Sequence, residues 1–163
     1  MKKYILAIDA GTTSSRAIIF DKNGQEVGVA QYEFEQHFPK EGWVEHDPIE
    51  IWNTQKKAIL DVLSETNIKA SELDSVGITN QRETTVVWNK NNGEPVHNAI
   101  VWQDRRTAQI CQNLLKEGHE TTIQNKTGLV LDAYFSGTKI QWIIDQNSEN
   151  RKLAESGALI FGT

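Results

Sequence analysis

A short turn near the N-terminus combines the residue types that bind phosphate. The apolar run at residues 4–8 ends at Asp9, and a small turn leads into a second apolar run at residues 17–20. This pattern predicts a β-hairpin, in which Gly11 supplies the backbone freedom of a tight turn. The turn also holds four hydroxyl groups, those of Thr12, Thr13, Ser14 and Ser15. Together with free backbone N–H groups, these hydroxyls would form a concave set of donors for phosphate oxygens.

Two charged residues flank this turn. A carboxylate beside a polyphosphate is repelled unless a cation lies between them, so we interpret Asp9 as a direct or water-mediated ligand of Mg²⁺. Arg16 can offer a fork of donors to the same phosphates. The alternative is an ordinary hairpin whose aspartate is satisfied by neighbouring N–H groups. The chain has no G-x-x-x-x-G-K-[ST] sequence, which excludes a P-loop as the phosphate site.

A second polar group follows a predicted strand at residues 75–79. Four polar residues, Asn80 to Glu83, come directly after it, and ligands of open α/β sheets collect at such strand ends. Arg82 can donate to one hydroxyl and Glu83 can accept from the next, as a vicinal diol requires. Neighbours on a regular strand face opposite ways, so the backbone must bend here for both to touch one ligand. A weak surface ion pair is the alternative.

Two aromatic residues are further candidates. Trp102 closes a predicted strand at residues 99–102, where it would either form an apolar wall against the carbon face of a polyol or cap the core. Tyr134 provides the hydroxyl of an irregular apolar loop at residues 128–135, and packing is the alternative explanation for it.

The elements that must position these residues follow from the pattern of the sequence. Residues 25–34 predict a third antiparallel strand with a bulge near Ala30. Asp47 and Pro48 predict the start of a helix, with Glu50 reaching back in a capping box and Trp52 on its buried face. A strand is also expected at residues 84–88, and helices are expected at residues 104–118, 119–127, 136–145 and 151–156. This order predicts an α/β fold with a mixed sheet that begins with three antiparallel strands.

The composition limits the classes of function. The 163 residues are 38% hydrophobic and 24% charged, which is typical of a globular protein with a core. A net charge of -5 argues against nucleic-acid or anionic-membrane binding. The single cysteine, Cys111, fits a reducing compartment, and the first apolar run is too short for a signal peptide. We therefore expect a cytoplasmic protein without membrane insertion. The four histidines show no metal-site spacing.

The motifs resemble a known family. The segment from Asp9 to Ser14, followed by Arg16, resembles the first phosphate loop of the actin, heat-shock ATPase and sugar-kinase superfamily. Longer segments resemble the glycerol kinases of the FGGY carbohydrate kinase family; they lie at residues 9–21, 42–48, 50–52, 77–85, 98–103 and 134–139. The resemblance spans essentially the whole chain. It implies a ribonuclease-H-like domain with helices on both faces of the sheet.

The resemblance also implies roles for individual residues. The metal ligand would be Asp9, and the contacts to the ATP phosphates would be Thr12, Thr13, Ser14 and Arg16. The glycerol pocket would be lined by Arg82, Glu83, Trp102 and Tyr134. The implied reaction is ATP- and Mg²⁺-dependent phosphorylation of glycerol to sn-glycerol 3-phosphate, in glycerol uptake and catabolism, by a homo-oligomer, a dimer or a tetramer.

Three residues depart from the family pattern, and some parts of such a kinase are expected beyond this chain. Ala10 stands where glutamine is usual, Asp104 where a small residue is usual, and Ala133 where proline is usual. The chain ends in a segment that resembles a point well before the middle of such kinases. We therefore expect residues 1–163 to be an incomplete N-terminal kinase domain, with the catalytic base and the second lobe beyond Thr163 and no turnover by this piece alone.

Two other functions stay open at this point. One is a kinase for another polyol or for a ketose, which substrate profiling of the full-length protein would separate. The other is an ATP-driven actin-like or chaperone-like switch. Arg82, Glu83 and Trp102, which match a diol, argue against the switch, whereas nucleotide affinity that does not respond to glycerol would favour it.

Overall fold

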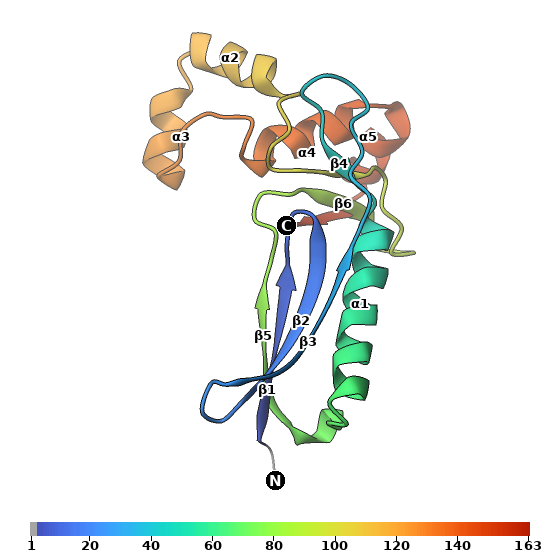
Figure 1. The fold of residues 1–163 in the computed structure, drawn as a ribbon. Helices are drawn as coiled ribbons and strands as arrows, with labels where there is room; N and C mark the ends of the chain where they lie inside the picture. The colour runs from blue at the N-terminus through green and yellow to red at the C-terminus, as the bar shows by residue number, and fades with distance from the viewer. Residues whose placement is uncertain (1–2) are drawn as a thin grey trace. The chain divides into compact units, whose positions relative to one another are not determined.

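A computed structural model describes residues 3–163. Its elements form two compact units (Figure 1). Unit 1 comprises the described residues up to Gln36 together with Asp47–Gln81, and unit 2 comprises His37–His46 with Arg82–Thr163. Among the described residues, no helix is both long and apolar enough to span a bilayer.

Unit 1 is built on a four-stranded sheet with the order β3-β2-β1-β5. The strands are β1 (Tyr4–Ala10), β2 (Ser14–Asp21), β3 (Glu26–Glu33) and β5 (Leu73–Thr79). The pairs β1–β2 and β2–β3 are antiparallel, and β5 runs parallel to β1. The predicted opening of three antiparallel strands is thus confirmed. The parallel pairing places Thr79, the last residue of β5, beside Asp9.

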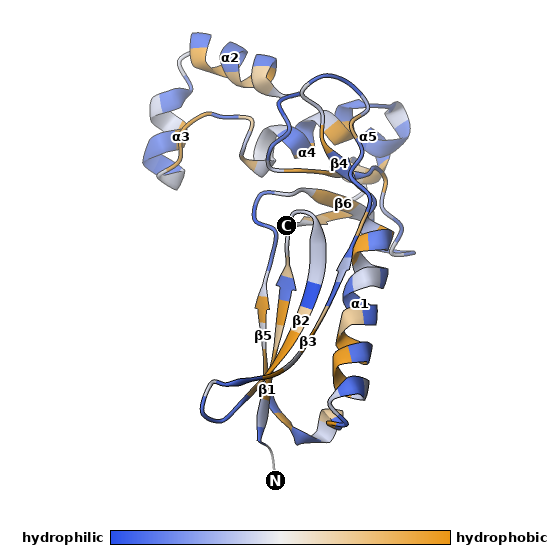
Figure 2. Cartoon of the chain, viewed as in Figure 1, coloured by the Kyte–Doolittle hydropathy of each residue, from blue (hydrophilic) through white to orange (hydrophobic). Residues whose placement is uncertain are grey.

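Helix α1 (Pro48–Glu65) packs on this sheet. Leu6, Ile19 and Val62 are among the residues of the core between them. Figure 2 shows hydrophobic residues along the strands and along part of α1. The 3-10 helix η1 (Ala70–Glu72) then leads into β5.

The start of α1 confirms part of the predicted cap. The Asp47 carboxylate accepts from the Ile49 N–H at 2.8 Å, as an N-cap does. Glu50 accepts from the Glu35 N–H at 3.2 Å and so ties the helix to the segment that follows β3, whereas a capping box was expected. The prediction that Trp52 is buried is wrong for this chain. Its side chain is 63% exposed, because the buried face of α1 runs through Gln55 and two small apolar residues.

The predicted bulge lies elsewhere in β3. Ala30 pairs regularly with Ala17, and the register shifts where Phe20 pairs with Glu26, so the irregularity is at Val27. The neighbouring Gly28 passes close to the end of α1. A Cβ at that position would lie 2.4 Å from the Thr66 methyl carbon.

Unit 2 consists of short strand pairs and four helices. Strands β4 (Glu45–His46) and β7 (Ala99–Ile100) pair, as do β6 (Val86–Asn89) and β8 (Leu159–Gly162). The helices are α2 (Ala108–Lys116), α3 (Glu120–Thr127), α4 (Ser136–Asp145) and α5 (Ser148–Glu155). Val87, Ile100 and Ile143 form the centre of its core.

Two helix boundaries in unit 2 differ from the predictions. Helix α2 begins at Ala108 and not at Asp104, because the Asp104 carboxylate accepts from the Val44 N–H at 2.7 Å and from the Arg106 N–H at 2.8 Å and so fixes a turn. Helix α5 begins earlier than residue 151, because the side chain of Asn147 caps it by accepting from the Asn150 N–H. The bounds of α4 are those predicted.

Candidate functional site

The turn between β1 and β2 is tight and is held from a distant strand end. The Gly11 N–H donates to the Ser14 carbonyl at 2.9 Å, and a Cβ on Gly11 would lie 2.9 Å from that oxygen. The Gln81 side-chain amide donates to the Gly11 carbonyl at 2.7 Å. Gln81 therefore positions the turn, a role that was not predicted although Gln81 is one of the polar residues after this strand.

The hydroxyl groups of the turn separate into two kinds. Thr13 is exposed, Thr12 is half-buried, and the Ser14 hydroxyl accepts from Gln31 Nε2 at 2.9 Å. Ser15 is fully buried, and its hydroxyl lies 2.9 Å from the Thr54 hydroxyl of α1. The interpretation of Ser15 as a phosphate donor is therefore wrong, because this side chain joins β2 to α1. The other three residues stay candidates for phosphate contact.

Asp9 and Arg16 face each other across the hairpin. Asp9 Oδ2 accepts from Arg16 Nη2 at 2.5 Å and from Nε at 3.1 Å. The two side chains are 29% and 43% exposed, respectively, so water reaches both. Without a bound ligand, Arg16 thus neutralises the charge of Asp9. We call residues 9–16 the phosphate hairpin.

The donor set of the phosphate hairpin is compatible with Mg²⁺. Within residues 3–163 no group of three His, Cys, Asp or Glu side chains is placed to hold a metal ion. Mg²⁺ in nucleotide sites does not need such a group, because it keeps several waters and takes one or two carboxylates plus substrate phosphates. Asp9 Oδ1 accepts no hydrogen bond from the described residues. Asp9 can therefore supply the one carboxylate oxygen.

The backbone bends at Glu83, as contact of both Arg82 and Glu83 with one ligand would require. Its φ of 64° is left-handed, a conformation that non-glycine residues rarely adopt and that occurs at functional sites. Its Oε2 atom accepts from the Ser136 N–H at 3.0 Å and from the Ser136 hydroxyl at 2.9 Å. Since residue 135 is a phenylalanine and offers no side-chain cap, Glu83 caps α4 from outside the helix.

Two aromatic rings lie in contact with each other in unit 2. The rings of Trp102 and Tyr134 are 6.0 Å apart at 66°, an edge contact. The Trp102 N–H donates to the hydroxyl of Thr84, the residue after Glu83, at 3.3 Å. The structure thus brings Glu83, Trp102 and Tyr134 into one region of unit 2, which we call the polyol corner. The Arg82 side chain is exposed and forms no hydrogen bond or ion pair with the described residues.

Charged side chains hold the backbone of the polyol corner. The Asp132 carboxylate accepts from the Tyr134 N–H at 2.8 Å and takes a two-pronged ion pair from Arg105, at 2.7 and 3.1 Å. The hydrogen bonds from Arg105 keep the pKa of Asp132 below its usual value. The Lys139 ammonium donates to the carbonyls of Glu83, at 2.8 Å, and Tyr134, at 2.6 Å.

A buried ionic cluster lies behind the turn that carries Trp102. Arg106 is 0% exposed at its side chain, and its Nη2 atom lies 2.8 Å from both Asp104 Oδ2 and Glu45 Oε1. The guanidinium carbon lies 3.9 Å from the ring centre of Trp43 and 4.6 Å from that of Trp142. Asp104, which departs from the family pattern, therefore has a structural role as a partner of Arg106.

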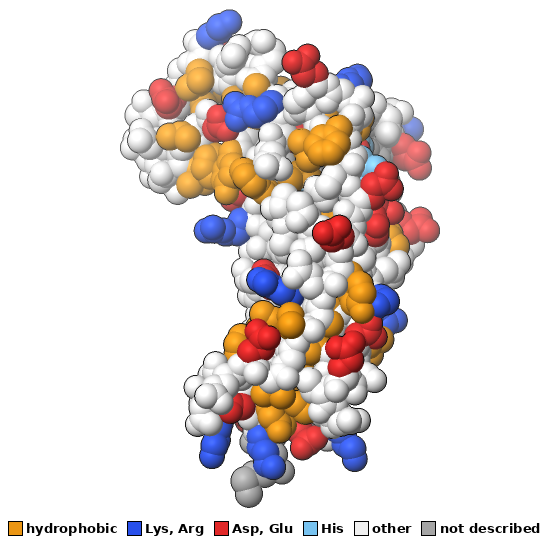
Figure 3. All heavy atoms as spheres, in the orientation of Figure 1, with side chains coloured by type: hydrophobic (Ala, Val, Ile, Leu, Met, Phe, Trp, Pro, Cys, Tyr) orange, Lys and Arg blue, Asp and Glu red, His pale blue; other side chains and the backbone are white. Residues whose placement is uncertain are grey.

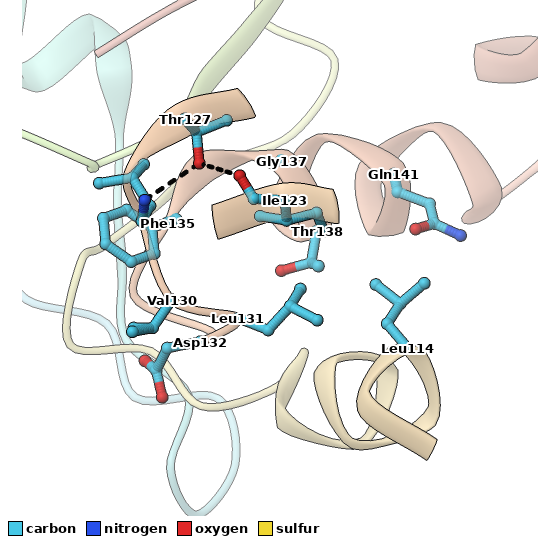
Figure 4. A pocket seen from close by; sticks show the side chains of 11 residues that line it. Leu114, Ile123, Thr127, Val130, Leu131, Asp132, Phe135, Gly137, Thr138 and Gln141 are labelled. Atoms are coloured by element: carbon cyan, nitrogen blue, oxygen red, sulfur yellow. Dashed lines mark hydrogen bonds between the residues drawn. The ribbon is translucent and has the colours of Figure 1, made fainter. Parts of the chain in front are cut away.

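An apolar pocket of about 300 Å³ lies in unit 2 (Figure 4). It is lined by Leu114, Ile123, Thr127, Leu129, Val130, Leu131, Asp132, Phe135, Gly137, Thr138 and Gln141. Figure 3 shows hydrophobic side chains gathered around α3 and the loop that follows it, and Val130 in that loop is 57% exposed. The carboxylate in the lining, Asp132, is already paired with Arg105. The pocket therefore lacks charged groups available for phosphoryl chemistry.

Comparisons with known proteins show which family the chain resembles. The model of the N-terminal domain of the FGGY family of carbohydrate kinases matches residues 4–162. Glycerol kinase of Petrotoga mobilis and glycerol kinase 1 of Clostridium tetani are each 63% identical to the chain over 163 residues. These matches cover 100% of the chain and 33% of each relative, so the chain spans about a third of their length.

Solved structures show the same fold. The structure of Plasmodium falciparum glycerol kinase with ADP matches with a TM-score of 0.90 at 34% identity. The match covers 98% of this chain and 32% of the Plasmodium chain. Gluconate kinase from Lactobacillus acidophilus matches with a TM-score of 0.82 at 23% identity, over 93% of this chain and 30% of that one. The second likeness concerns the fold alone.

Proposed function

Because the chain belongs to the FGGY family of carbohydrate kinases, we propose that the full-length protein is a glycerol kinase that converts ATP and glycerol into ADP and sn-glycerol 3-phosphate. The names of relatives that are 58–63% identical over the whole chain support glycerol as the substrate. Residues 1–163 would be the N-terminal kinase domain, and the second lobe and the catalytic base would lie outside them. This piece alone would then show no turnover.

The observation that carries the proposal is the polyol corner. A polyol presents hydroxyl groups and a carbon face, so its site needs hydrogen-bonding groups beside an apolar wall. The left-handed bend at Glu83 turns this residue away from a regular strand, and one carboxylate oxygen is fixed by Ser136. Its second oxygen would accept from one glycerol hydroxyl while Arg82 donates to the next. Trp102 and Tyr134 would cover the carbon face.

The phosphate hairpin would bind the nucleotide. Thr12, Thr13 and Ser14 would donate to phosphate oxygens, and Asp9 would hold Mg²⁺, which supplies neutralisation of the phosphate charge. Arg16 is paired with Asp9 in the chain alone, at a surface where such pairs contribute little. A cation at Asp9 would therefore release Arg16 to the phosphates.

The reaction is a transfer of one phosphoryl group. A primary hydroxyl oxygen of glycerol forms a bond to the γ-phosphorus, and the bond between that phosphorus and the β,γ-bridging oxygen breaks, which releases ADP. The hydroxyl proton passes to a carboxylate that we assign outside this chain. The residues of this chain contribute by placing acceptor and donor and by neutralising charge.

The setting of the enzyme is part of the proposal. The buried free thiol of Cys111 and the absence of any other cysteine suit the cytoplasm. The net charge of -5 does not favour a nucleic-acid partner. By its resemblance to the family, the full-length protein would be a homo-oligomer.

The test is substrate profiling of the purified full-length protein. ADP release would be measured with ATP, Mg²⁺ and, in turn, glycerol, other polyols, D-xylulose and D-gluconate. We expect kcat/KM for glycerol to exceed the others by roughly 100-fold, since a site that hydrogen-bonds each hydroxyl rejects poor matches strongly. A higher value for a ketose would contradict glycerol as the substrate. ATP hydrolysis that responds to none of them would favour the switch.

A further inference from the structure

Lys139 is a buried charge that the proposed reaction does not use directly. Its side chain, on α4, is fully buried in unit 2. Burying an ammonium group is unfavourable unless it is paired and hydrogen-bonded, so a lysine at such a position needs a reason. Burial is also the main cause that lowers its pKa to about 8. The carboxylates of Glu83, Asp104 and Asp132 oppose that effect, and Arg105 adds to it.

The reason lies in the two partners of the ammonium group. Nζ donates to the carbonyl of Glu83 at 2.8 Å and to that of Tyr134 at 2.6 Å. These two residues are separated by 51 positions in the sequence, and both belong to irregular backbone: Glu83 has a left-handed φ of 64°, and Tyr134 lies just before Phe135, the N-cap of α4. One side chain therefore joins the two loops of the polyol corner at the residues assigned to glycerol.

Each of the two loops has a second attachment that is independent of Lys139. The Glu83 carboxylate is held by Ser136, and the Tyr134 N–H is held by Asp132. The contact from Asp132 fixes Tyr134 within its own loop, whereas the contacts with Ser136 tie the Glu83 side chain to the start of α4, two residues after Tyr134. Lys139 adds a link between the two backbones themselves, because both carbonyls accept from one atom, and so sets the spacing of these carbonyls.

We propose that Lys139 is a positioning residue for the polyol substrate, which fixes the distance between Glu83 and Tyr134 by holding both carbonyls on one ammonium group. This inference rests on the proposed function. Lys139 does not touch the substrate, because no part of it is exposed. Its removal would take the ammonium donor from both carbonyls and leave that of Glu83 with the longer hydrogen bond from the Thr85 hydroxyl, at 3.3 Å, so the loops would separate or shift.

The first test uses Lys139→Met in the full-length enzyme, since methionine fills similar space without an ammonium group. We expect the KM for glycerol to rise roughly tenfold or more while the KM for ATP stays within about twofold. Lys139→Arg restores charge and donors and should recover part of the loss. The matched control is Lys126→Met, which alters an exposed lysine of α3 in the same unit and should change neither KM.

The second test does not depend on the identity of the substrate. Hydrogen exchange of the unliganded full-length protein would be compared between wild type and Lys139→Met. The amides of residues 83–86 and 134–137 should exchange faster in the variant, while those of β1 to β3 should not change. If wild type fails to phosphorylate glycerol but this difference appears, the proposed substrate is wrong and the positioning of the two loops stands.

Several results would overturn the proposal. A folded Lys139→Met enzyme with an unchanged KM for glycerol would do so, as would an equal rise in both KM values. Unchanged exchange in both loops would show that Lys139 does not hold them. If neither the methionine nor the arginine variant folds, Lys139 serves the fold of unit 2 and not the polyol corner, and the proposal is wrong.

Discussion

The phosphate hairpin and the polyol corner use charge in opposite ways. In the hairpin, Asp9 and Arg16 are both partly exposed and pair with each other. In and behind the polyol corner, Lys139 and the Arg106 side chain are fully buried, and each joins segments that are distant in the sequence. An exposed pair can exchange partners at small cost, whereas a buried charge fixes the backbone around it. The hairpin is thus suited to a charged ligand that arrives and leaves, and the corner to a small neutral one that needs fixed geometry.

Loss of the buried cation Arg106 should have the largest effect on stability. Arg106→Met would leave the Asp104 and Glu45 carboxylates buried without their cation, so the free energy of unfolding should fall by about 3–5 kcal/mol. Denaturant unfolding followed by tryptophan fluorescence would measure this, because Trp43 and Trp142 flank the guanidinium.

The matched control for that variant is Arg151→Met. Arg151 pairs with Asp145, and both side chains are about half exposed. Its loss should change the free energy of unfolding by less than about 1 kcal/mol. Equal losses for the two arginine variants would show that burial does not distinguish the two kinds of pair.

Loss of the exposed pair between Asp9 and Arg16 should affect activity and leave stability nearly unchanged. Asp9→Asn in the full-length enzyme should lower kcat by roughly 10- to 100-fold and raise the Mg²⁺ concentration needed for half-maximal rate. The free energy of unfolding should change by less than about 1 kcal/mol, because the pair with Arg16 is partly exposed. Asp61→Asn, which breaks the exposed pair with Lys57, is the control in the same unit. An unchanged Mg²⁺ dependence in Asp9→Asn would exclude Asp9 as the ligand.

A smaller effect, on the pH dependence of stability, is expected from His46 in unit 2. Burial, with a contribution from His37, lowers the pKa of His46 to about 4, against 6.5 for an ordinary histidine. Between these values the unfolded chain takes up a proton that the folded chain does not. The contribution of His46 to the free energy of unfolding is therefore fully present above pH 6.5 and is lost as the pH falls toward 4.

The measurement is the unfolding midpoint of the full-length protein at pH 7.5 and at pH 5. Wild type should lose stability over this interval, and His46→Gln should lose less. His119→Gln, at an exposed position of the same unit, should behave as wild type. An identical pH dependence of wild type and His46→Gln would contradict the assignment.

Local patterns allowed much of the fold to be predicted from the sequence. The two apolar runs on either side of the turn at Gly11 predicted the hairpin. The bend that Arg82 and Glu83 would need to touch one ligand is present at Glu83, whose φ is left-handed. The motifs also identified the FGGY family, which the match over residues 4–162 confirms. Each of these signals is carried by neighbouring residues.

The features that could not be predicted depend on residues far apart in the chain. Trp52 and Ser15 were misplaced because the face that α1 buries is decided by its packing on the sheet, where Ser15 contacts Thr54. The roles of Lys139 and Arg106 were missed for a similar reason. A buried cation shows no local pattern, since Lys139 reaches Glu83 across 56 positions and Arg106 reaches Glu45 across 61. Such charges become visible only when the fold brings their partners together.

The most direct test of the polyol corner is the steady-state kinetics of Glu83→Gln in the full-length enzyme. This change keeps the shape of the side chain and an acceptor for Ser136, but it removes the charge that would accept from glycerol. We predict that the KM for glycerol rises roughly tenfold or more, as expected for the loss of a charged hydrogen bond, while the KM for ATP stays within about twofold. An unchanged KM for glycerol in a folded Glu83→Gln enzyme would contradict the account.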